Sequence, residues 1–312
     1  MAYAMNETAH PDMLTLIQVR EASPPATTIA EQRANWKTLS DAFRVQYPAD
    51  MNVGDEVMTS GGGPVPVRIY RPTNVTGSCV LYFHGGGFMK GDLNSGDTVA
   101  WGYADKVGAV VISVDYRLTP EHAYPAAFDD CYSALEYTHA NANGLGIDPT
   151  RIAVAGDSAG GNLAAAVSLA ARDRNGPAIA AQALIYPMLG LNLTQASGGE
   201  QSDAPVLSRR AVSEYWRLYL DDAGTTDDPY AAPLVGRDFA ELPSALIHTA
   251  ELDPLRDDGK VYAKRLSAAG TPATYRCAER MVHGFTRVRF EGPDVAREFD
   301  FICDFLGQHL SV

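Results

Sequence analysis

The sequence predicts an α/β protein with a mostly parallel sheet that is flanked by helices. Short apolar runs alternate with segments of helical periodicity along most of the chain, which is the pattern of repeated β–α units. One of these units carries a glycine-rich turn between its apolar run and its helix. A chain of 312 residues with 46% apolar residues can also bury a large core.

The strands are predicted from apolar runs that end at turn residues. Residues 65–70 alternate in polarity, and the proline at position 66 favours an edge strand because proline cannot donate to a central ladder. The other predicted strands are 79–83, 109–114, 152–155, 181–186, 245–249 and 273–277. Helical segments separate most of them, as parallel strands require.

The first 50 residues are predicted to be helical. Asp12 is placed to cap a short helix, and apolar residues from Ile29 to Phe43 recur at near-helical spacing. The β–α alternation breaks after Pro187. Residues 193–205 are polar and rich in glycine and serine, which predicts a mobile loop. Ser208 is then expected to cap a helix with an apolar stripe.

The segment Gly156-Asp157-Ser158-Ala159-Gly160-Gly161 has the pattern G-x-S-x-G between a strand and a helix. Such a turn holds the serine in a strained conformation at the carboxyl end of the sheet. Gly156 and Gly160 remove the Cβ atoms that would collide with neighbouring backbone. Ser158 is therefore the candidate nucleophile, and Asp157 beside it is expected to be structural.

A second motif, His84-Gly85-Gly86-Gly87-Phe88, directly follows the apolar run 79–83. Three glycines let the main chain approach a reacting carbonyl, and backbone N–H donors stabilise the oxyanion of acyl transfer. The alternative is a tight glycine turn with His84 as a polar cap. Its position upstream of the serine motif favours the catalytic interpretation.

The acid and the base of a triad follow the serine in this chain order. Asp253 lies after the predicted strand 245–249 and before Pro254, which favours a loop conformation. Glu251 is the competing acid. His283 stands beside Gly284 in a short loop after 273–277, whereas His309 lies near the end of the terminal helix. We therefore expect Asp253 and His283 to complete the triad.

These motifs resemble the hormone-sensitive-lipase-like (bacterial family IV) serine carboxylesterases of the α/β-hydrolase superfamily. The matching segments, in the family's order, are HGGGF at 84–88, DYRLTPEHAYPAAFDD at 115–130, GDSAGG at 156–161, DPLRD at 253–257 and HGF at 283–285. The resemblance covers the chain from about residue 65 to its end. Thr119 departs from the alanine that is commoner in the family.

The resemblance implies an α/β-hydrolase fold with a mostly parallel eight-stranded sheet and a helical cap. The cap would comprise 1–50 and 190–235, and the core 51–189 and 236–312. Gly86, Gly87 and Ala159 would supply the oxyanion-hole N–H groups, and Gly85 would shape the loop. Family members hydrolyse short- to medium-chain acyl esters without a metal or organic cofactor, and dimers are common. The candidates for lining the pocket are Phe88, Trp36, Leu189, Tyr215 and Trp216.

Three other functions use the same fold. An amidase or deacetylase and a long-chain lipase could employ the same triad, since the triad does not identify the leaving group. A non-catalytic small-molecule-binding protein is the third, as in the plant gibberellin receptors, which resemble this family but lack a working triad. The presence of Ser158, Asp253 and His283 together argues against a receptor.

Composition excludes several partners. A net charge of −13 argues against binding to nucleic acids or to anionic membranes. The sequence holds no apolar run of about 18 residues and no signal peptide at residues 1–11, so we expect a cytoplasmic protein without membrane insertion. Three of the four cysteines lie in apparent strands or helices, so we expect buried free thiols.

Overall fold

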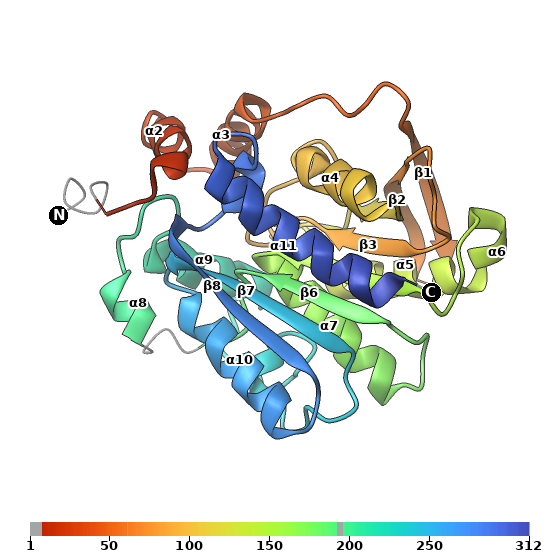
Figure 1. Cartoon of the computed structure of the whole chain (residues 1–312). Helices are drawn as coiled ribbons and strands as arrows, with labels where there is room; N and C mark the ends of the chain where they lie inside the picture. The colour runs from red at the N-terminus through yellow and green to blue at the C-terminus, as the bar shows by residue number, and fades with distance from the viewer. Residues whose placement is uncertain (1–7, 61, 192–195, 312) are drawn as a thin grey trace.

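The computed structural model describes residues 8–60, 62–191 and 196–311. Its centre is an eight-stranded sheet in the order β1-β2-β4-β3-β5-β6-β7-β8 (Figure 1). The strands are β1 (Asn52–Ser60), β2 (Gly63–Arg71), β3 (Cys79–Phe83), β4 (Val110–Val114), β5 (Ile152–Asp157), β6 (Ala181–Ile185), β7 (Ser244–Leu252) and β8 (Ala273–Val282). Neighbouring strands from β4 to the edge strand β8 pair in parallel, whereas β2 runs antiparallel to both of its neighbours, β1 and β4. The prediction of a mostly parallel eight-stranded sheet is therefore confirmed.

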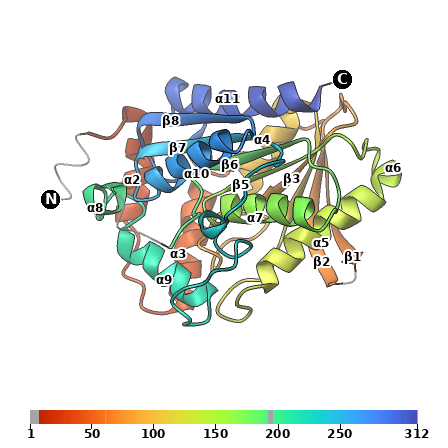
Figure 2. The ribbon, with the colours of Figure 1, turned by 90° about the horizontal axis from the view of Figure 1, so that it is seen from below.

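The helices cover both faces of the sheet (Figure 2). They are α2 (Leu14–Glu21), α3 (Ile29–Ala42), α4 (Asp97–Val107), α5 (Ala126–Ala140), α6 (Ala142–Leu145), α7 (Ala159–Asp173), α8 (Ala196–Glu200), α9 (Arg209–Tyr219), α10 (Arg256–Ala268) and α11 (Pro293–Leu310), with short 3₁₀ turns at Pro11–Met13, Pro233–Val235 and Phe285–Val288. Helices α5, α7 and α10 lie on one face, and α4 and α11 lie on the other.

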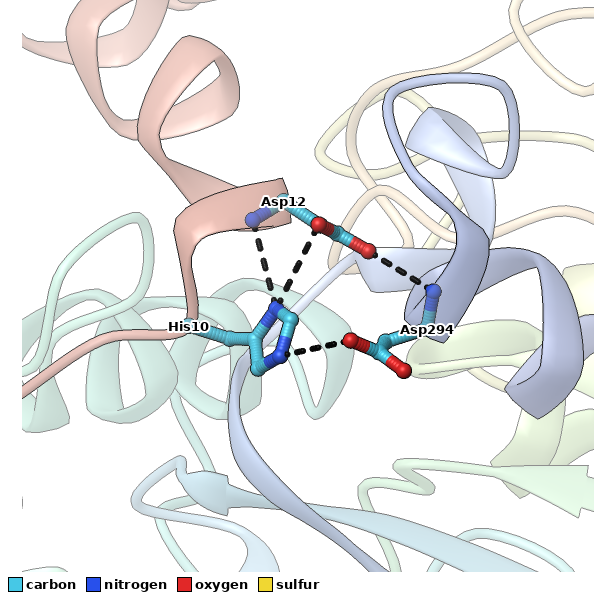
Figure 3. Close-up of side chains that lie close together, drawn as sticks. All are labelled: His10, Asp12 and Asp294. Atoms are coloured by element: carbon cyan, nitrogen blue, oxygen red, sulfur yellow. Dashed lines mark hydrogen bonds and ion pairs between the residues drawn. The ribbon is translucent and has the colours of Figure 1, made fainter.

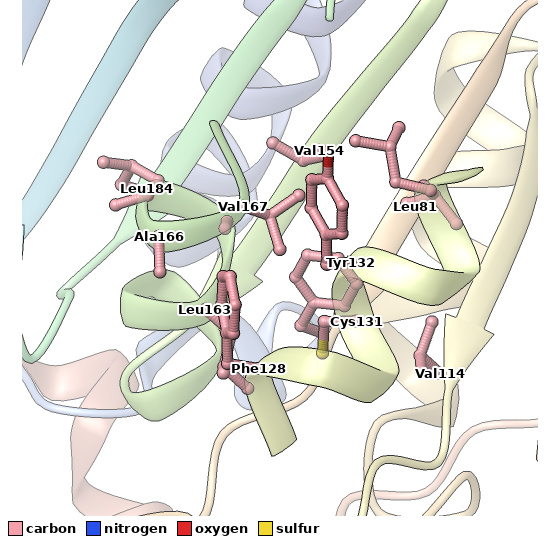
Figure 4. Packing of buried hydrophobic residues seen from close by; sticks show 14 of the residues in the cluster. Leu81, Val114, Phe128, Cys131, Tyr132, Val154, Leu163, Ala166, Val167 and Leu184 are labelled. Carbon is pink, nitrogen blue, oxygen red and sulfur yellow. The ribbon is translucent and has the colours of Figure 1, made fainter. Parts of the chain in front are cut away.

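The alternation of side chains along each strand divides the buried residues into two cores. Leu81 and Phe83 of β3 face the core beneath α5 and α7, while Val80 and Tyr82 face the core beneath α4 and α11. In Figure 4, Leu163 and Val167 of α7 lie in the first core, together with aromatic side chains of α5. A central strand that is buried on both faces reads as a continuous apolar run, which is why β3 was found from sequence.

Strand β2 corrects the prediction of an edge strand at 65–70. It lies second in the sheet, and the edge is β1, which sequence analysis did not identify. The Pro66 carbonyl accepts from Asp115 N at 3.0 Å, just beyond the end of β4. In an antiparallel strand, the nitrogen and the carbonyl of one residue point to the same side, so the Pro66 nitrogen also faces β4. The ladder with β4 begins only at Val67, and no donor is needed at Pro66.

Asp12 also departs from expectation, because it does not cap its own helix. His10 occupies the N-cap position of the 3₁₀ turn Pro11–Met13. The Asp12 carboxylate instead accepts from the N–H group of Asp294 at 3.0 Å, at the start of α11 (Figure 3). It also accepts from the N–H group of Val295 at 3.0 Å. The His10 ring lies between the two carboxylates, with Nε2 3.1 Å from Asp294 Oδ2. Residues 282 positions apart are thereby joined.

Of the remaining local predictions, some agree with the structure and others do not. Thr28 and Glu31 form a capping box that begins α3, and Ser208 caps α9 as predicted. The mobile loop predicted at 193–205 instead contains α8, and residues 193–195 lie outside the described residues. All four cysteines are free, and three are buried as predicted, but Cys277 of β8 is exposed. No described helix is both long and apolar enough to cross a membrane.

Candidate active site

Ser158 lies on a sharp turn between β5 and α7. Its φ of 58° and ψ of −116° are strained values for a residue with a Cβ atom. Hydrogen bonds fix this conformation: Ser158 N donates to Ile185 O at 2.9 Å, and its carbonyl accepts from Met188 N at 3.2 Å. A Cβ atom at Gly156 would overlap the Gly160 carbonyl, so glycine is required there.

Ser158, His283 and Asp253 form one hydrogen-bonded chain. His283 Nε2 lies 2.9 Å from Ser158 Oγ, and His283 Nδ1 lies 2.7 Å from Asp253 Oδ2. The three residues follow β5, β8 and β7, whose carboxyl ends meet at one edge of the sheet. Asp253 is completely buried, and its Oδ1 accepts from Leu255 N at 2.9 Å. The imidazole is thus held between an acid and a hydroxyl, as general-base catalysis requires.

Glu251, the competing acid, does not contact His283. Its carboxylate accepts from Arg280 N at 2.7 Å and so bridges β7 to β8. His309 bonds its own helix through the Phe305 carbonyl at 2.9 Å. The residues that sequence analysis ranked second for the acid and the base therefore serve local structure.

Gly86 and Gly87 lie beside Ser158 and His283 on the wall of a cavity of about 1000 Å³. Both glycines have positive φ, 141° and 63°, which L side chains rarely adopt. No described residue accepts a hydrogen bond from either N–H group. Ala159 is the first residue of α7, so its N–H also has no partner in a preceding turn. These three N–H groups are the donors that sequence analysis predicts for the oxyanion hole.

Asp157 positions this glycine loop. Its carboxylate accepts from Tyr82 OH at 2.6 Å and from Gly85 N at 2.9 Å, and it forms an ion pair with Arg287. Both charged groups are buried, so each compensates the other. Arg287 in turn lies over the Trp36 ring of α3, 4.4 Å from its centroid. The structural role expected for Asp157 agrees with these contacts.

His84 is also a structural side chain. It is fully buried, and its ring stacks on Tyr116 with 4.4 Å between centroids. Burial lowers the pKa of His84, so the neutral imidazole is favoured. A Cβ atom at Gly85 would contact the Asp157 carboxylate, so this glycine permits the loop to approach β5 closely.

The cavity wall comes mainly from the N-terminal helices and from α9. Of the five candidates from sequence, Trp36 and Tyr215 line the cavity. Phe88, Leu189 and Trp216 are not among its described lining residues. Phe88 instead stacks on Tyr219, with 3.7 Å between centroids. Sequence analysis overlooked Lys90 and Arg287, although each lies a few residues after a recognised motif.

Among the described residues, only His10, Asp12 and Asp294 come close enough together to offer three metal ligands. Two N–H groups already bond the Asp12 carboxylate at the start of α11. None of the three residues lines the cavity that holds Ser158.

Comparison with known proteins decides the family. A model of the alpha/beta hydrolase fold matches residues 80–287, more than half of the chain. The chain belongs to the alpha/beta hydrolase fold family. The protein is 39% identical over 276 residues to an esterase of Mycobacterium tuberculosis, LipI, covering 86% of each chain. It is 44% identical over 237 residues to a carboxylesterase of the same organism, NlhH, covering 74% of each.

The structure of this hydrolase is also similar to those of solved esterases. It matches EstE1, a thermostable carboxylesterase from a metagenomic library, with a TM-score of 0.86 and 37% identity. The match covers 92% of this chain and 99% of EstE1. Together, these similarities place the chain among the hormone-sensitive-lipase-like carboxylic ester hydrolases, as its motifs indicated.

Proposed function

We propose that this protein is a serine carboxylesterase that hydrolyses short- to medium-chain acyl esters through an acyl-enzyme on Ser158. The observation that carries the proposal is the hydrogen-bonded chain from Ser158 Oγ through His283 to Asp253 on the wall of the cavity. Relatives named esterase and carboxylesterase support the reaction class.

The first half of the reaction forms the acyl-enzyme. His283 Nε2 takes the proton of Ser158 Oγ as this oxygen attacks the ester carbonyl. Asp253 holds the imidazole in the required tautomer and stabilises its charged form. The N–H groups of Gly86, Gly87 and Ala159 bind the oxyanion, and the alcohol leaves with the proton from His283.

The second half releases the acid. His283 deprotonates a water molecule, whose oxygen attacks the acyl carbonyl. The tetrahedral intermediate collapses, and the proton returns from His283 to Ser158 Oγ as the carboxylic acid leaves.

We further propose that 1–50 and 190–235 act as a cap over the core formed by 51–189 and 236–312. Contacts of α3 support this division: Arg33 donates to Met89 O at 2.8 Å, just beyond the glycine loop, and pairs with Glu121. A cap of this kind would exclude water and shape the substrate pocket. The possible homodimer and the cytoplasmic location stay predictions.

The test is a series of p-nitrophenyl esters from acetyl to palmitoyl, measured with the wild type and Ser158→Ala. We expect a peak at short or medium chains and a loss of about 10⁴–10⁶ in kcat for the variant. The control is Ser168→Ala, which alters a buried serine within α7 that is not among the described lining residues of the cavity. It should keep its activity within about twofold.

Three results would contradict parts of the proposal. Activity that survives in Ser158→Ala would exclude the acyl-enzyme. Hydrolysis only of long, micellar esters would favour a lipase. Hydrolysis of amides in preference to esters would favour an amidase.

A further inference from the structure

The cavity that holds Ser158 has a charge opposite to that of the whole chain. The protein carries a net charge of −13. The charged residues that line the cavity are nevertheless mainly basic: Arg20, Lys90, Arg210 and Arg217, against Glu214 alone. A basic cleft in an acidic protein concentrates anionic ligands at that cleft.

The acidic residue of the wall is already paired. Glu214 accepts two hydrogen bonds from Arg217, at 2.8 Å each, in a bidentate ion pair. Among the described residues, no carboxylate lies within ion-pair distance of Arg20, Arg210 or Lys90. Within the described part of the chain, these three cations form no ion pair, although the charge of Arg210 also acts on Glu214.

Lys90 is the buried member of this set, with only 7% of its surface exposed. Its ammonium donates to Tyr215 OH at 2.7 Å and lies 4.7 Å and 5.2 Å from the ring centroids of Tyr215 and Trp36. The aromatic faces offset part of the cost of burying a cation. An ammonium has three donors, and Tyr215 OH is its one hydrogen-bond partner among the described residues.

The ammonium lies close to the reacting centre. Lys90 belongs to the glycine loop, since its N–H donates to Gly86 O at 3.1 Å. The Tyr215 ring lies against Gly87, where a Cβ atom would come within 2.5 Å of it. Tyr215 thus separates the ammonium from the proposed oxyanion hole by little more than one phenol ring.

We propose that Lys90 binds a free carboxylate of the substrate, so that the preferred esters carry an anionic group apart from the scissile bond. This inference rests on the proposed esterase function and specifies its substrate class. Arg20 and Arg210, which are exposed at the cavity, attract the anion, and Lys90 supplies the two free donors that hold it. The carboxylate belongs either to the acyl group or to the alcohol.

A purely structural role for Lys90 makes a different prediction. Its contacts with Trp36 and Tyr215 join α3 and α9 to the glycine loop. If this junction were its only role, removing the amine would slow neutral and anionic esters by the same factor. The ratio of their rates therefore separates the two roles.

The experiment measures kcat/KM for two matched pairs of esters. Mono-p-nitrophenyl glutarate and p-nitrophenyl pentanoate place the anion on the acyl side, and 4-acetoxybenzoate and its methyl ester place it on the alcohol side. We expect the anionic-to-neutral ratio to fall about tenfold or more in Lys90→Met for at least one pair. Lys90→Arg should restore most of the ratio, because it keeps the charge.

Lys106→Met is the matched control, because Lys106 lies on α4 and pairs with Asp300 away from the cavity wall. Its ratio should stay within about twofold of the wild type. A ratio that Lys90→Met leaves within about twofold for both pairs would overturn the proposal.

A second measurement covers the cases in which Lys90→Met does not fold or the protein hydrolyses no ester. Calorimetric titration of wild-type protein and of Ser158→Ala with glutarate should show binding, whereas uncharged glutaramide should bind at least about tenfold more weakly. Equal binding would overturn the anionic subsite. Glutarate binding without ester hydrolysis would overturn only the esterase function.

Discussion

At the residue scale, the choice between two acids shows what sequence can predict. Glu251 and Asp253 are two positions apart, and both follow an apolar strand. Pro254 favoured Asp253 because a residue before proline is kept out of helical conformation. The structure gives the two carboxylates different partners: His283 for Asp253, and a backbone N–H of β8 for Glu251.

We therefore expect Asp253→Asn to lower kcat by about 10⁴, because asparagine favours the wrong imidazole tautomer. Glu251→Gln is the matched control, since it also replaces a carboxylate by an amide and keeps an acceptor for Arg280 N. It should stay within about threefold of the wild type. Steady-state kinetics on a p-nitrophenyl ester would check both variants, and equal losses would refute the assignment.

Chemistry that depends on a local motif was predictable, and chemistry that depends on tertiary contacts was not. The residue types around Ser158 and in the glycine loop by themselves indicate the backbone conformation there. Lys90 is three residues beyond Gly87, but its burial against Tyr215 and Trp36 requires three separate segments to meet. No periodicity or motif encodes such a meeting.

At the scale of elements, Asp12 shows how a helix terminus is stabilised from a distance. The first N–H groups of α11 have no partners within the helix, and Asp12 accepts from two of them. Its negative charge also interacts favourably with the positive end of the helix dipole. Pro293 at the first position of α11 contributes no donor of its own.

We expect Asp12→Ala to lower the free energy of unfolding by about 1–2 kcal/mol, the usual cost of losing a cap. Urea denaturation followed by circular dichroism measures this difference. Asp304→Ala is the control, because Asp304 is exposed on the same helix. If the two variants lost equal stability, the cap would not be the cause.

Strands buried on both faces were found from sequence because they read as unbroken apolar runs, whereas β1 was not. Most of its described side chains are exposed or half-buried, so the run Asn52–Ser60 lacks the apolar signal. The error in placing β2 has the same origin. Because β1 was not predicted, β2 had no predicted neighbour on its outer side, and Pro66 then favoured an edge strand.

At the scale of the whole molecule, the N-terminal segment and the region around α9 meet over one cavity, although more than 150 residues separate them in the sequence. Arg287 and Lys90, from the core, both lie against Trp36 of α3. The family resemblance implies that both segments belong to a cap, and this assignment stays a proposal. The sign of the charge in the cavity was hidden by the acidic composition of the chain.

One buried carboxyl couples the whole fold to pH. Asp258 of α10 accepts from Gly190 N at 2.9 Å, at the point where the chain leaves the core for α8 and α9. Burial raises its pKa from 3.8 to about 7, against the opposing effect of its backbone hydrogen bonds. The unfolded chain loses this proton at much lower pH than the folded protein does.

The sign of the effect follows from linkage. Because the folded pKa is the higher one, the folded state binds more protons between pH 4 and 7, and stability from this group falls as pH rises through that window. Above about pH 7, the full cost of burying the ionised Asp258 carboxylate lowers the free energy of unfolding, by an amount of the order of 4 kcal/mol for a shift of about three pKa units. Below about pH 4 it vanishes.

We expect Asp258→Asn to remove this pH dependence, because asparagine resembles the protonated acid and keeps an oxygen for Gly190 N. Unfolding by urea at several pH values between 4 and 8 gives the difference in stability between the variant and the wild type. The free energy of unfolding of the variant should increase relative to that of the wild type as pH rises. The difference cancels the titration of all other groups, including His248, whose pKa burial lowers. A difference that stays constant with pH would show that Asp258 titrates alike in the folded and unfolded chains.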